Sequence, residues 1–408
     1  MYHFSTLSEY LLMAWTAFRA HKLRSTLTTL GIFIGVTTII TIFITIQGLN
    51  EYVIGELSNI GSSKIFIQKY PWVIKGDFWK YRNRKNITYK EYEALLKYSK
   101  VADYICPRVF SQRTIKYKNE TLENILIIGT TDQYKDTDNI SPEKGRFFTE
   151  LDVHRNHRVC IIGYEVAKNF FENENAIGKR VKIGDAKYRV VGTLEKLGTI
   201  FGQNIDNWVF VPIGSFKRAI SGHIDLQIAL SVLDYTKIED MKDETRGILR
   251  KVRKIAPGEE DDFAINQQDQ LTDLYKQLTS TLFAIVFIIG GISLVVGGIG
   301  IMNIMLVSVT ERTKEIGLRK AIGARRINIL FQFLIESIFI TSIGGILGII
   351  FGYLAGLGVL SKMNLSTSIS ILSIIIGFGF SSMVGIIAGF YPAWKGAKLN
   401  PIDSLRYE

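Results

Sequence analysis

The residue types that could bind a metal or catalyse a reaction are sparse in this chain. His154 and His157 lie three positions apart beside Asp152, but a zinc site would need a third and a fourth ligand that the sequence does not place. The motifs G-x-S-x-G, H-E-x-x-H and C-x-x-C are absent. The sequence therefore predicts no catalytic residue, no cofactor-binding residue and no metal ligand.

A phosphate-binding loop would need the pattern G-x-x-x-x-G-K-[ST], whose backbone amides cradle the phosphates of a nucleotide. The nearest fragment is 177–180, which lacks the upstream glycine and the hydroxyl residue. We therefore expect no ATP hydrolysis by this route in the chain.

The densest charge pattern lies in residues 310–326, between two apolar stretches. Glu311, Glu315 and Arg319 follow one another at intervals of one helical turn. Apolar residues at the same spacing indicate a short amphipathic helix that ends near Gly323. The residues alone leave two interpretations open: a basic loop that fixes membrane topology, or a helix that docks a cytoplasmic motor.

Long uncharged stretches must position this segment. Four of them, each of 25 residues or more, contain no Asp, Glu, Lys, Arg or His: 25–50, 277–310, 337–361 and 363–394. About 20 apolar residues span a bilayer as a helix. We predict transmembrane helices at 25–48, 277–309, 327–360 and 363–394. The second stretch would be about 50 Å long as one helix, so we expect it to include a stalk outside the membrane.

Lys and Arg near the span ends predict the membrane orientation. The segments before the first span, between the second and third, and after the fourth together hold 12 Lys/Arg and five acidic residues. The sequence therefore places the N-terminus, the C-terminal tail at 395–408 and residues 310–326 in the cytoplasm. Residues 49–276 lie outside, with 36 Lys/Arg and 32 Asp/Glu. The net charge of +11 thus follows mainly from topology and does not indicate nucleic-acid binding.

The spans lack the paired carboxylates or basic residues that a proton or ion pathway would need. Glu336 is the charged residue closest to a span interior. A structural pairing with the basic residues of 310–326 is favoured over a gating role.

Small residues recur at four-residue spacing in three of the spans. They are Gly31 and Gly35 in the first, Gly344, Gly348, Gly352 and Gly356 in the third, and Gly377, Ser381, Gly385 and Gly389 in the fourth. Such stripes let helix backbones approach closely. Packing within one subunit and an interface between subunits both stay open.

Residues 1–24 precede the first span. Leu7, Leu11, Trp15 and Phe18 recur at helical spacing, which predicts an amphipathic helix in the cytoplasmic membrane interface. A soluble helix that packs on a partner is the alternative.

The outer segment mixes strand and helix signals. β-rich runs at 64–68, 125–128, 158–162 and 188–192 accompany helical patterns at 89–98 and 237–255. Their order predicts an α+β domain formed by 49–130 and 226–276, with a β-rich subdomain inserted at 131–225. Cys106 and Cys160 both lie here, where a disulfide is one interpretation. The apolar run around Cys160 favours a buried thiol.

Residues 310–326 resemble the signature loop of MacB/FtsX-type ABC transporter permeases. The matching residues are Glu311, Arg312, Glu315, Ile316, Gly317, Arg319, Lys320, Ala321, Gly323 and Ala324. Residues 22–35 resemble the first span of that family, and 392–408 resemble its C-terminus. With one span before the outer segment and three after it, the resemblance covers essentially the whole chain.

The resemblance implies a non-catalytic α-helical membrane protein with four transmembrane helices, whose α+β extracytoplasmic domain has a porter-like fold with an inserted β-rich subdomain. ATP and Mg would be bound by cytoplasmic ABC ATPase subunits. The residues that couple to them would be Glu311, Arg312, Glu315, Ile316, Gly317, Arg319, Lys320 and Gly323. Helix packing would use Gly344, Gly348, Gly352, Gly377, Gly385 and Gly389.

A second permease copy or a paralogue would complete a dimer in contact with membrane lipid, and some members work with a periplasmic adaptor and an outer-membrane duct. The resulting expectation is an exporter subunit in the bacterial inner membrane that carries ATP-driven movement to its outer domain (mechanotransmission). Its cargo would be antibiotics, peptides or similar molecules. Because nothing precedes the interfacial helix, a separate ATPase chain is expected. Lipoprotein release and a non-transporting signalling scaffold are the alternatives.

Overall fold

The computed structural model describes residues 22–74, 76, 78–172, 174–200, 203–219, 225–363, 365 and 371–405. The chain divides into two compact units. The helical unit contains the residues up to Val53 and from Lys276 onward, and the α/β unit contains Ile54–Tyr275. Each unit has its own hydrophobic core.

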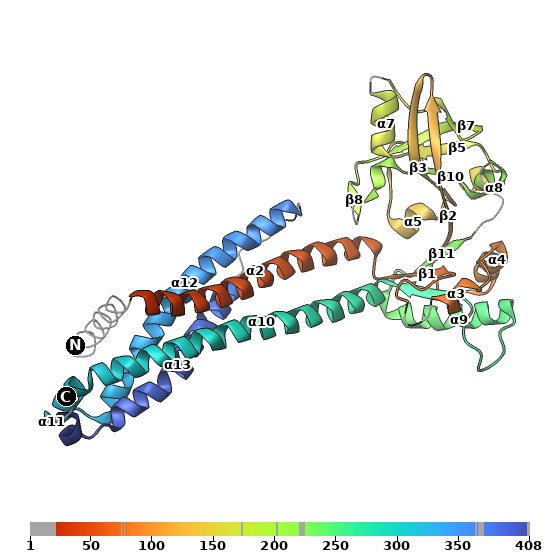
Figure 1. The fold of residues 1–408 in the computed structure, drawn as a ribbon. Helices are drawn as coiled ribbons and strands as arrows, with labels where there is room; N and C mark the ends of the chain where they lie inside the picture. The colour runs from red at the N-terminus through yellow and green to blue at the C-terminus, as the bar shows by residue number, and fades with distance from the viewer. Residues whose placement is uncertain are drawn as a thin grey trace. The chain divides into compact units, whose positions relative to one another are not determined.

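Four long helices dominate the helical unit: α2 (Lys22–Ile60), α10 (Gln268–Glu311), α12 (Arg326–Lys362) and α13 (Ile371–Lys398) (Figure 1). Each is long and apolar enough to cross a membrane, which confirms the four spans expected from the sequence. The amphipathic helix predicted at 1–24 lies outside the described residues, apart from 22–24 at the start of α2. Residues 364 and 366–370 of the predicted fourth span also lie outside them.

Two of these helices continue from one unit into the other. The unit boundaries at Val53 and Lys276 fall inside α2 and α10, which have 39 and 44 residues. At 1.5 Å per residue α10 is about 66 Å long, more than twice the ~30 Å hydrocarbon core of a bilayer. An unbroken helix therefore connects the second span to the α/β unit.

The glycine stripe of α12 faces α2. A Cβ atom on Gly348 would lie 2.8 Å from Val36 Cβ, and one on Gly352 would lie 2.9 Å from the Thr37 carbonyl oxygen. This approach allows the Thr37 hydroxyl to donate to Gly348 O at 3.3 Å and the Thr41 hydroxyl to donate to Gly352 O at 3.1 Å. The stripe thus makes its contacts within the chain.

The small residues of α13 face α12 in the same way. A Cβ on Gly377 would lie 2.9 Å from Ile349, and one on Gly389 would collide with Ser337. The Ser337 hydroxyl donates to Gly385 O at 3.0 Å. The predicted packing glycines of both helices therefore line contacts between neighbouring helices, and Gly344 does so against α2.

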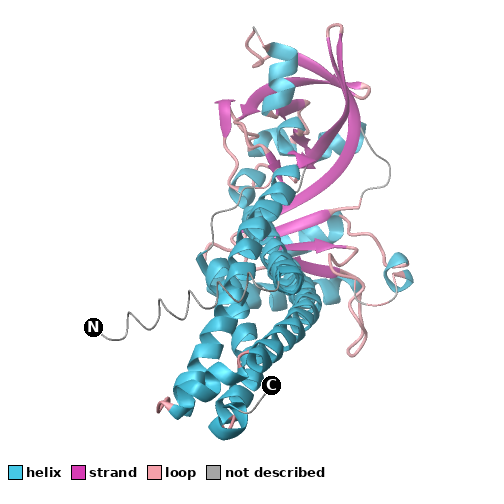
Figure 2. Cartoon of the chain, turned by 60° about the vertical axis from the view of Figure 1, so that its left-hand side comes forward, coloured by secondary structure: helices cyan, strands magenta, loops and turns pink. Residues whose placement is uncertain are grey.

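One sheet of ten strands forms the α/β unit, in the order β12-β1-β11-β2-β3-β10-β5-β7-β4, and β6 pairs with β2 and β7. Figure 2 draws the strands in magenta. The strands are β1 (Lys64–Gln68), β2 (Tyr104–Tyr117), β3 (Glu120–Thr130), β4 (Pro142–Gly145), β5 (Val159–Ile162), β6 (Arg180–Ile183), β7 (Ala186–Leu194), β10 (Val209–Pro212), β11 (Gln227–Ser231) and β12 (Ala264–Gln267). A short separate ribbon joins β8 (Thr199–Ile200) to β9 (Gln203–Asn204).

The long strand β2 divides this sheet into two parts. Its residues 104–108 pair with β11, and 109–117 pair with β3. The first part carries α3 (Trp79–Arg82), α4 (Tyr89–Tyr98) and α9 (Ile238–Arg253), as Figure 1 shows. The second carries α5 (Tyr134–Asp138), α6 (Glu150–His154), α7 (Tyr164–Phe171) and α8 (Ile213–Ala219).

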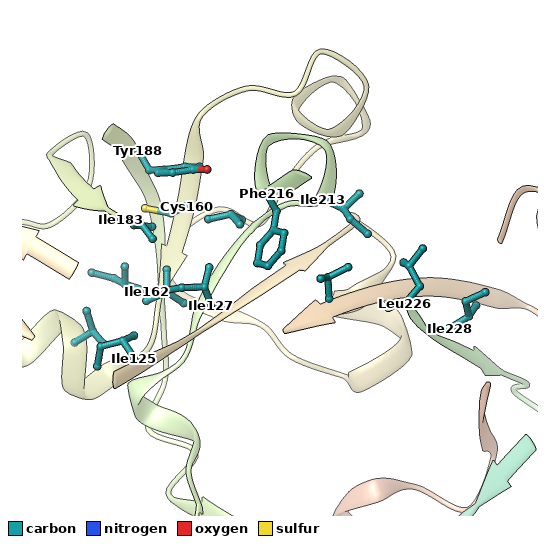
Figure 3. Close-up of a cluster of buried hydrophobic side chains, with 14 of the residues drawn as sticks. Ile125, Ile127, Cys160, Ile162, Ile183, Tyr188, Ile213, Phe216, Leu226 and Ile228 are labelled. Atoms are coloured by element: carbon teal, nitrogen blue, oxygen red, sulfur yellow. The ribbon is translucent and has the colours of Figure 1, made fainter. Parts of the chain in front are cut away.

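The boundary between the two parts differs from the sequence expectation. The sequence predicts that residues 49–130 belong to the first part, whereas β3 pairs in parallel with β10. Ile125 and Ile127 of β3 pack in one cluster with Cys160 and Ile162 of β5 (Figure 3). The inserted part therefore begins inside β2. The sequence does not predict this boundary, because an apolar run predicts a strand but not which strand lies beside it.

Both cysteines are buried free thiols, Cys160 in this cluster and Cys106 in a second one. Cys106 lies with its sulfur 3.1 Å from the Thr130 hydroxyl, and burial raises the pKa of both thiols. The interpretation of Cys160 as a buried thiol is confirmed, and the alternative of a disulfide is wrong.

We predict that Gly352→Val destabilises the helical unit by about 1–3 kcal/mol, because the added side chain must force α2 away from α12. The free energy of unfolding of the detergent-solubilised chain measures the effect. Gly358→Val on the same helix is the matched control, since a Cβ there meets nothing within 4 Å. Equal destabilisation by both changes would show that the close contact is not what matters.

Candidate functional site

The charged segment between α10 and α12 folds as the helix α11 (Thr313–Ala321). The Thr313 hydroxyl donates to the carbonyl of Val309 in the preceding helix at 3.1 Å. The chain leaves α11 through Gly323, whose φ of +105° is a left-handed conformation that glycine adopts without strain. The predicted short helix ending near Gly323 is therefore present.

Two charged side chains of this segment bind α12. Arg319 donates to Gln332 Oε1 at 2.6 Å and also pairs with Glu315 one turn earlier at 2.5 Å. Arg312 lies 3.6 Å from the carboxylate of Glu336, which is only 2% exposed. This pairing agrees with the structural role favoured for Glu336 from the sequence.

Two further residues hold α11 against the end of the chain. Lys320 donates to the carbonyls of Ala397 and Leu399 at 2.5 and 2.6 Å, where α13 ends. A cation there satisfies helix-end carbonyls that have no partner within the helix. Burial, with the charge of Arg326, lowers the pKa of Lys320.

The glycine of α11 provides the other contact. A Cβ on Gly317 would lie 2.6 Å from Ser404 Cβ on the short helix α14 (Pro401–Leu405). Gly317 therefore allows α14 to pack directly on α11, so that α11 is fixed on two sides.

The contacts of α11 with α12, α13 and α14 leave one edge of the helix in solvent. Leu318 and Ile322, one turn apart, are 53% and 79% exposed, and Lys314 and Glu315 are exposed beside them. Ile316, a predicted coupling residue, is only 3% exposed. We call Leu318 and Ile322 the exposed edge of α11.

The eight predicted coupling residues therefore have different surroundings. Three of them are exposed: Glu311, Glu315 and Gly323. Three are half-buried in contacts with α12 and α13: Arg312, Arg319 and Lys320. The other two, Ile316 and Gly317, are buried. Leu318 and Ile322 are among the apolar residues whose spacing predicts the short helix, but sequence reasoning does not single them out as contacts. Their position opposite Ile316 on the helix was the signal that could have identified them.

The histidine pair of the α/β unit is accounted for by local structure. Asp152 accepts from Thr149 and Arg146, and His157 Nδ1 lies 3.0 Å from Asp152 Oδ1. Although burial opposes it, these bonds hold the pKa of Asp152 well below its usual range. Across the described ranges, no group of three His, Cys, Asp or Glu side chains is arranged to hold a metal ion.

Two family models match the chain. Residues 25–248 match the MacB-like periplasmic core domain, and residues 287–401 match the FtsX-like permease C-terminal domain. The first match alone covers more than half of the chain.

Similar proteins include the macrolide export ATP-binding/permease protein MacB of Bdellovibrio bacteriovorus, 35% identical over 403 residues. That match covers 98% of this chain and 62% of MacB, so the chain spans less than two thirds of that relative. The ABC transporter permease YknZ of Bacillus subtilis is 32% identical over 406 residues, which cover 99% of this chain and 100% of YknZ. The crystal structure of the periplasmic region of MacB from Actinobacillus actinomycetemcomitans aligns with 19% identity and a TM-score of 0.45, covering 54% of this chain and 95% of that one.

We predict that Arg312→Ala lowers the free energy of unfolding by about 3 kcal/mol, because it leaves the Glu336 carboxylate buried without its partner. Adding Glu336→Gln to this variant removes the unpaired charge and should restore most of the loss. Thermal unfolding of the purified single and double variants measures both effects. A double variant no more stable than Arg312→Ala would contradict the pairing.

Proposed function

Because the chain belongs to the family of MacB-like and FtsX-like ABC transporter permeases, we propose that it transmits movement from an ABC ATPase to its α/β unit during export. The chain itself catalyses no reaction in this proposal. ATP and Mg bind to an ATPase domain or subunit outside these 408 residues.

The proposed orientation places α11, α14 and both ends of the chain in the cytoplasm and the α/β unit outside the inner membrane. The distribution of basic residues supports it, because the connections on the α11 side are rich in Lys and Arg. The ATPase then meets the membrane subunit at α11.

The observation that carries the proposal is the combination of a fixed helix and an exposed apolar edge at α11. Leu318 and Ile322 offer apolar surface that a soluble partner can cover, and Glu315 and Lys314 surround it with charge. Arg312, Arg319 and Lys320 tie the same helix to α12 and α13. A displacement of α11 by the partner is therefore passed to the membrane helices.

Continuity of α10 extends this path toward the α/β unit. The helix ends next to α11 at Glu311 and begins at Gln268, directly after β12. α10 is one continuous helix of 44 residues, about 66 Å long at 1.5 Å per residue. In the proposed mechanism a shift at the α11 end reaches β12 and the sheet through α10.

The remaining parts of the proposal follow from the relatives. By analogy with the macrolide exporter MacB, the cargo class is antibiotics, peptides or similar molecules. The working unit contains a second permease copy or a paralogue in membrane lipid, and a periplasmic adaptor with an outer-membrane duct where the cell has an outer membrane.

We predict that the double change Leu318→Asp and Ile322→Asp weakens recovery of the ATPase with the tagged chain by at least about tenfold, because central apolar contacts dominate such interfaces. The measurement is affinity purification in mild detergent with quantitative mass spectrometry of an ABC-type ATPase.

The control is Leu233→Asp, which places one Asp on a similarly exposed apolar residue of the α/β unit. Undiminished recovery of the ATPase with the double variant, or an equal loss with the control, would refute docking at this edge. Absence of any ABC-type ATPase with the unmodified chain would refute the motor itself.

A further inference from the structure

An apolar groove runs between α10 and α13 within the helical unit. Its volume is about 390 Å³, and every residue that lines it is a glycine or has an apolar side chain. Both helices are long and apolar enough to cross a membrane. We call this space the α10–α13 groove.

Missing side chains on α10 form the groove. A Cβ atom on Gly291 would meet nothing within 4 Å, so the space beside this glycine is open. One turn pair further along, a Cβ on Gly298 would lie 3.4 Å from Val384 of α13, so the two helices approach closely there. The rings of Phe287 and Phe380, with centroids 5.8 Å apart, bring the helices together again toward the start of α10. The groove therefore lies beside direct contacts between its two walls.

The rims of the groove face away from the helix bundle. Val295 and Ile299 of α10 are 63% and 50% exposed, and Met383 and Ile387 of α13 are 57% and 64% exposed. Because these residues belong to spanning helices, the groove opens toward the hydrocarbon of the bilayer. An occupant at this depth must be apolar, since the lining offers it no polar side chain.

The same face of α13 becomes aromatic and then basic toward its end. Ile387, Tyr391, Trp394 and Lys398 follow one another at spacings of four, three and four residues, which places them on one side of the helix. Tyr391 and Trp394 are 51% and 42% exposed, and the Lys398 ammonium lies 3.9 Å from the centre of the Trp394 ring. Tyr and Trp in such positions are typical of the membrane–water interface.

The basic end of this face has charge to spare. Lys395 and Lys398 are both exposed, and neither forms an ion pair with another residue that the structure describes. From Ile387 to Lys398 the helix rises about 16 Å, roughly half the ~30 Å thickness of a hydrocarbon core. A phospholipid whose phosphate lies at the lysines can therefore reach the groove with an acyl chain.

A second copy of the chain fits this face less well. Two copies related by a twofold axis along the membrane normal present the same residues to each other at the same depth. Packing through this face would bring the Lys395 and Lys398 side chains of both copies together, which like-charge repulsion opposes. An anionic lipid instead neutralises these lysines.

We propose that the α10–α13 groove and the basic end of α13 together bind one anionic phospholipid of the surrounding bilayer. An acyl chain lies in the groove against Gly291 and Ile387, and the phosphate accepts hydrogen bonds from Lys395 and Lys398. The headgroup then lies beside the end of α13, where Lys320 of α11 binds backbone carbonyls. This binding does not depend on the docking of an ATPase.

The test uses the full chain in phosphatidylcholine nanodiscs that contain a small fraction of phosphatidylglycerol with a diazirine in one acyl chain. After illumination, mass spectrometry should map the adducts to 291–302 of α10 and 383–388 of α13. Ile346, Ile350 and Leu354 of α12 are 49%, 49% and 59% exposed and serve as the internal comparison. We expect at least about fivefold more adduct in the groove than on α12. Adducts spread evenly over both surfaces would show ordinary boundary lipid and overturn the proposal.

A charge variant tests the headgroup site. Lys398→Gln should lower the phosphatidylglycerol adduct in the groove about fivefold, because a lysine at the membrane surface attracts anionic lipid. Lys362→Gln is the matched control, since Lys362 is the exposed last residue of α12 as Lys398 is of α13. An equal loss with both variants, or an equal loss with a phosphatidylcholine probe of the same design, would overturn binding at these lysines.

A second variant tests the groove. Gly291→Leu places a side chain into the open space and should strongly reduce the adduct, whereas Gly358→Leu on α12, where a Cβ also meets nothing within 4 Å, should preserve it. Equal melting temperatures of these two variants exclude a folding defect as the cause. An adduct that Gly291→Leu leaves unchanged would refute an acyl chain in the groove.

Discussion

Close approach of helix backbones is the constraint on which the helical unit depends. Lipid is as apolar as the side chains it surrounds, so burial alone gives spanning helices little reason to associate. The glycines of α12 allow α2 to come near enough for the hydroxyls of Thr37 and Thr41 to reach backbone carbonyls. Both the dispersion contacts and the hydrogen bonds between α2 and α12 therefore depend on the glycines of α12 having no side chain. The serine and glycine positions of α13 repeat this solution on another face of α12.

The position of α11 follows from that bundle. Its positively charged residues bind acceptors on α12 and α13, so they act chiefly as attachments and leave the outward edge apolar. A soluble partner that covers Leu318 and Ile322 gains hydrophobic contact on a helix that cannot move independently of its neighbours. The same arrangement that stabilises the helix therefore suits it to pass on movement in the proposed mechanism.

The α/β unit also contains neighbouring aromatic residues of which one is bonded to the sheet and another is exposed to solvent. Trp72 donates to Asn266 of β12 and to Gln68 of β1, while Trp79, seven residues further along the chain, is 64% exposed. Composition alone does not separate these two tryptophans, because both lie among the same aromatic and basic neighbours. The bond from the Trp72 amide to Asn266, 194 positions away in the chain, holds Trp72 against the sheet.

Several features of this protein were determined by sequence alone. The four uncharged stretches predict four spanning helices because a bilayer core tolerates few charges. Charge spacing predicts a short helix within 310–326 that ends near Gly323, and the structure has it at Thr313–Ala321. The sheet order, the boundary inside β2 and the burial of Ile316 were decided by tertiary structure. Local patterns report which residues are apolar and at what period, whereas strand neighbours and the buried side of a short helix depend on segments distant in the chain. For α11 those segments are α12 and α13, which bind its charges, and α14, which packs on Gly317. Together they determine that Leu318 and Ile322 face outward.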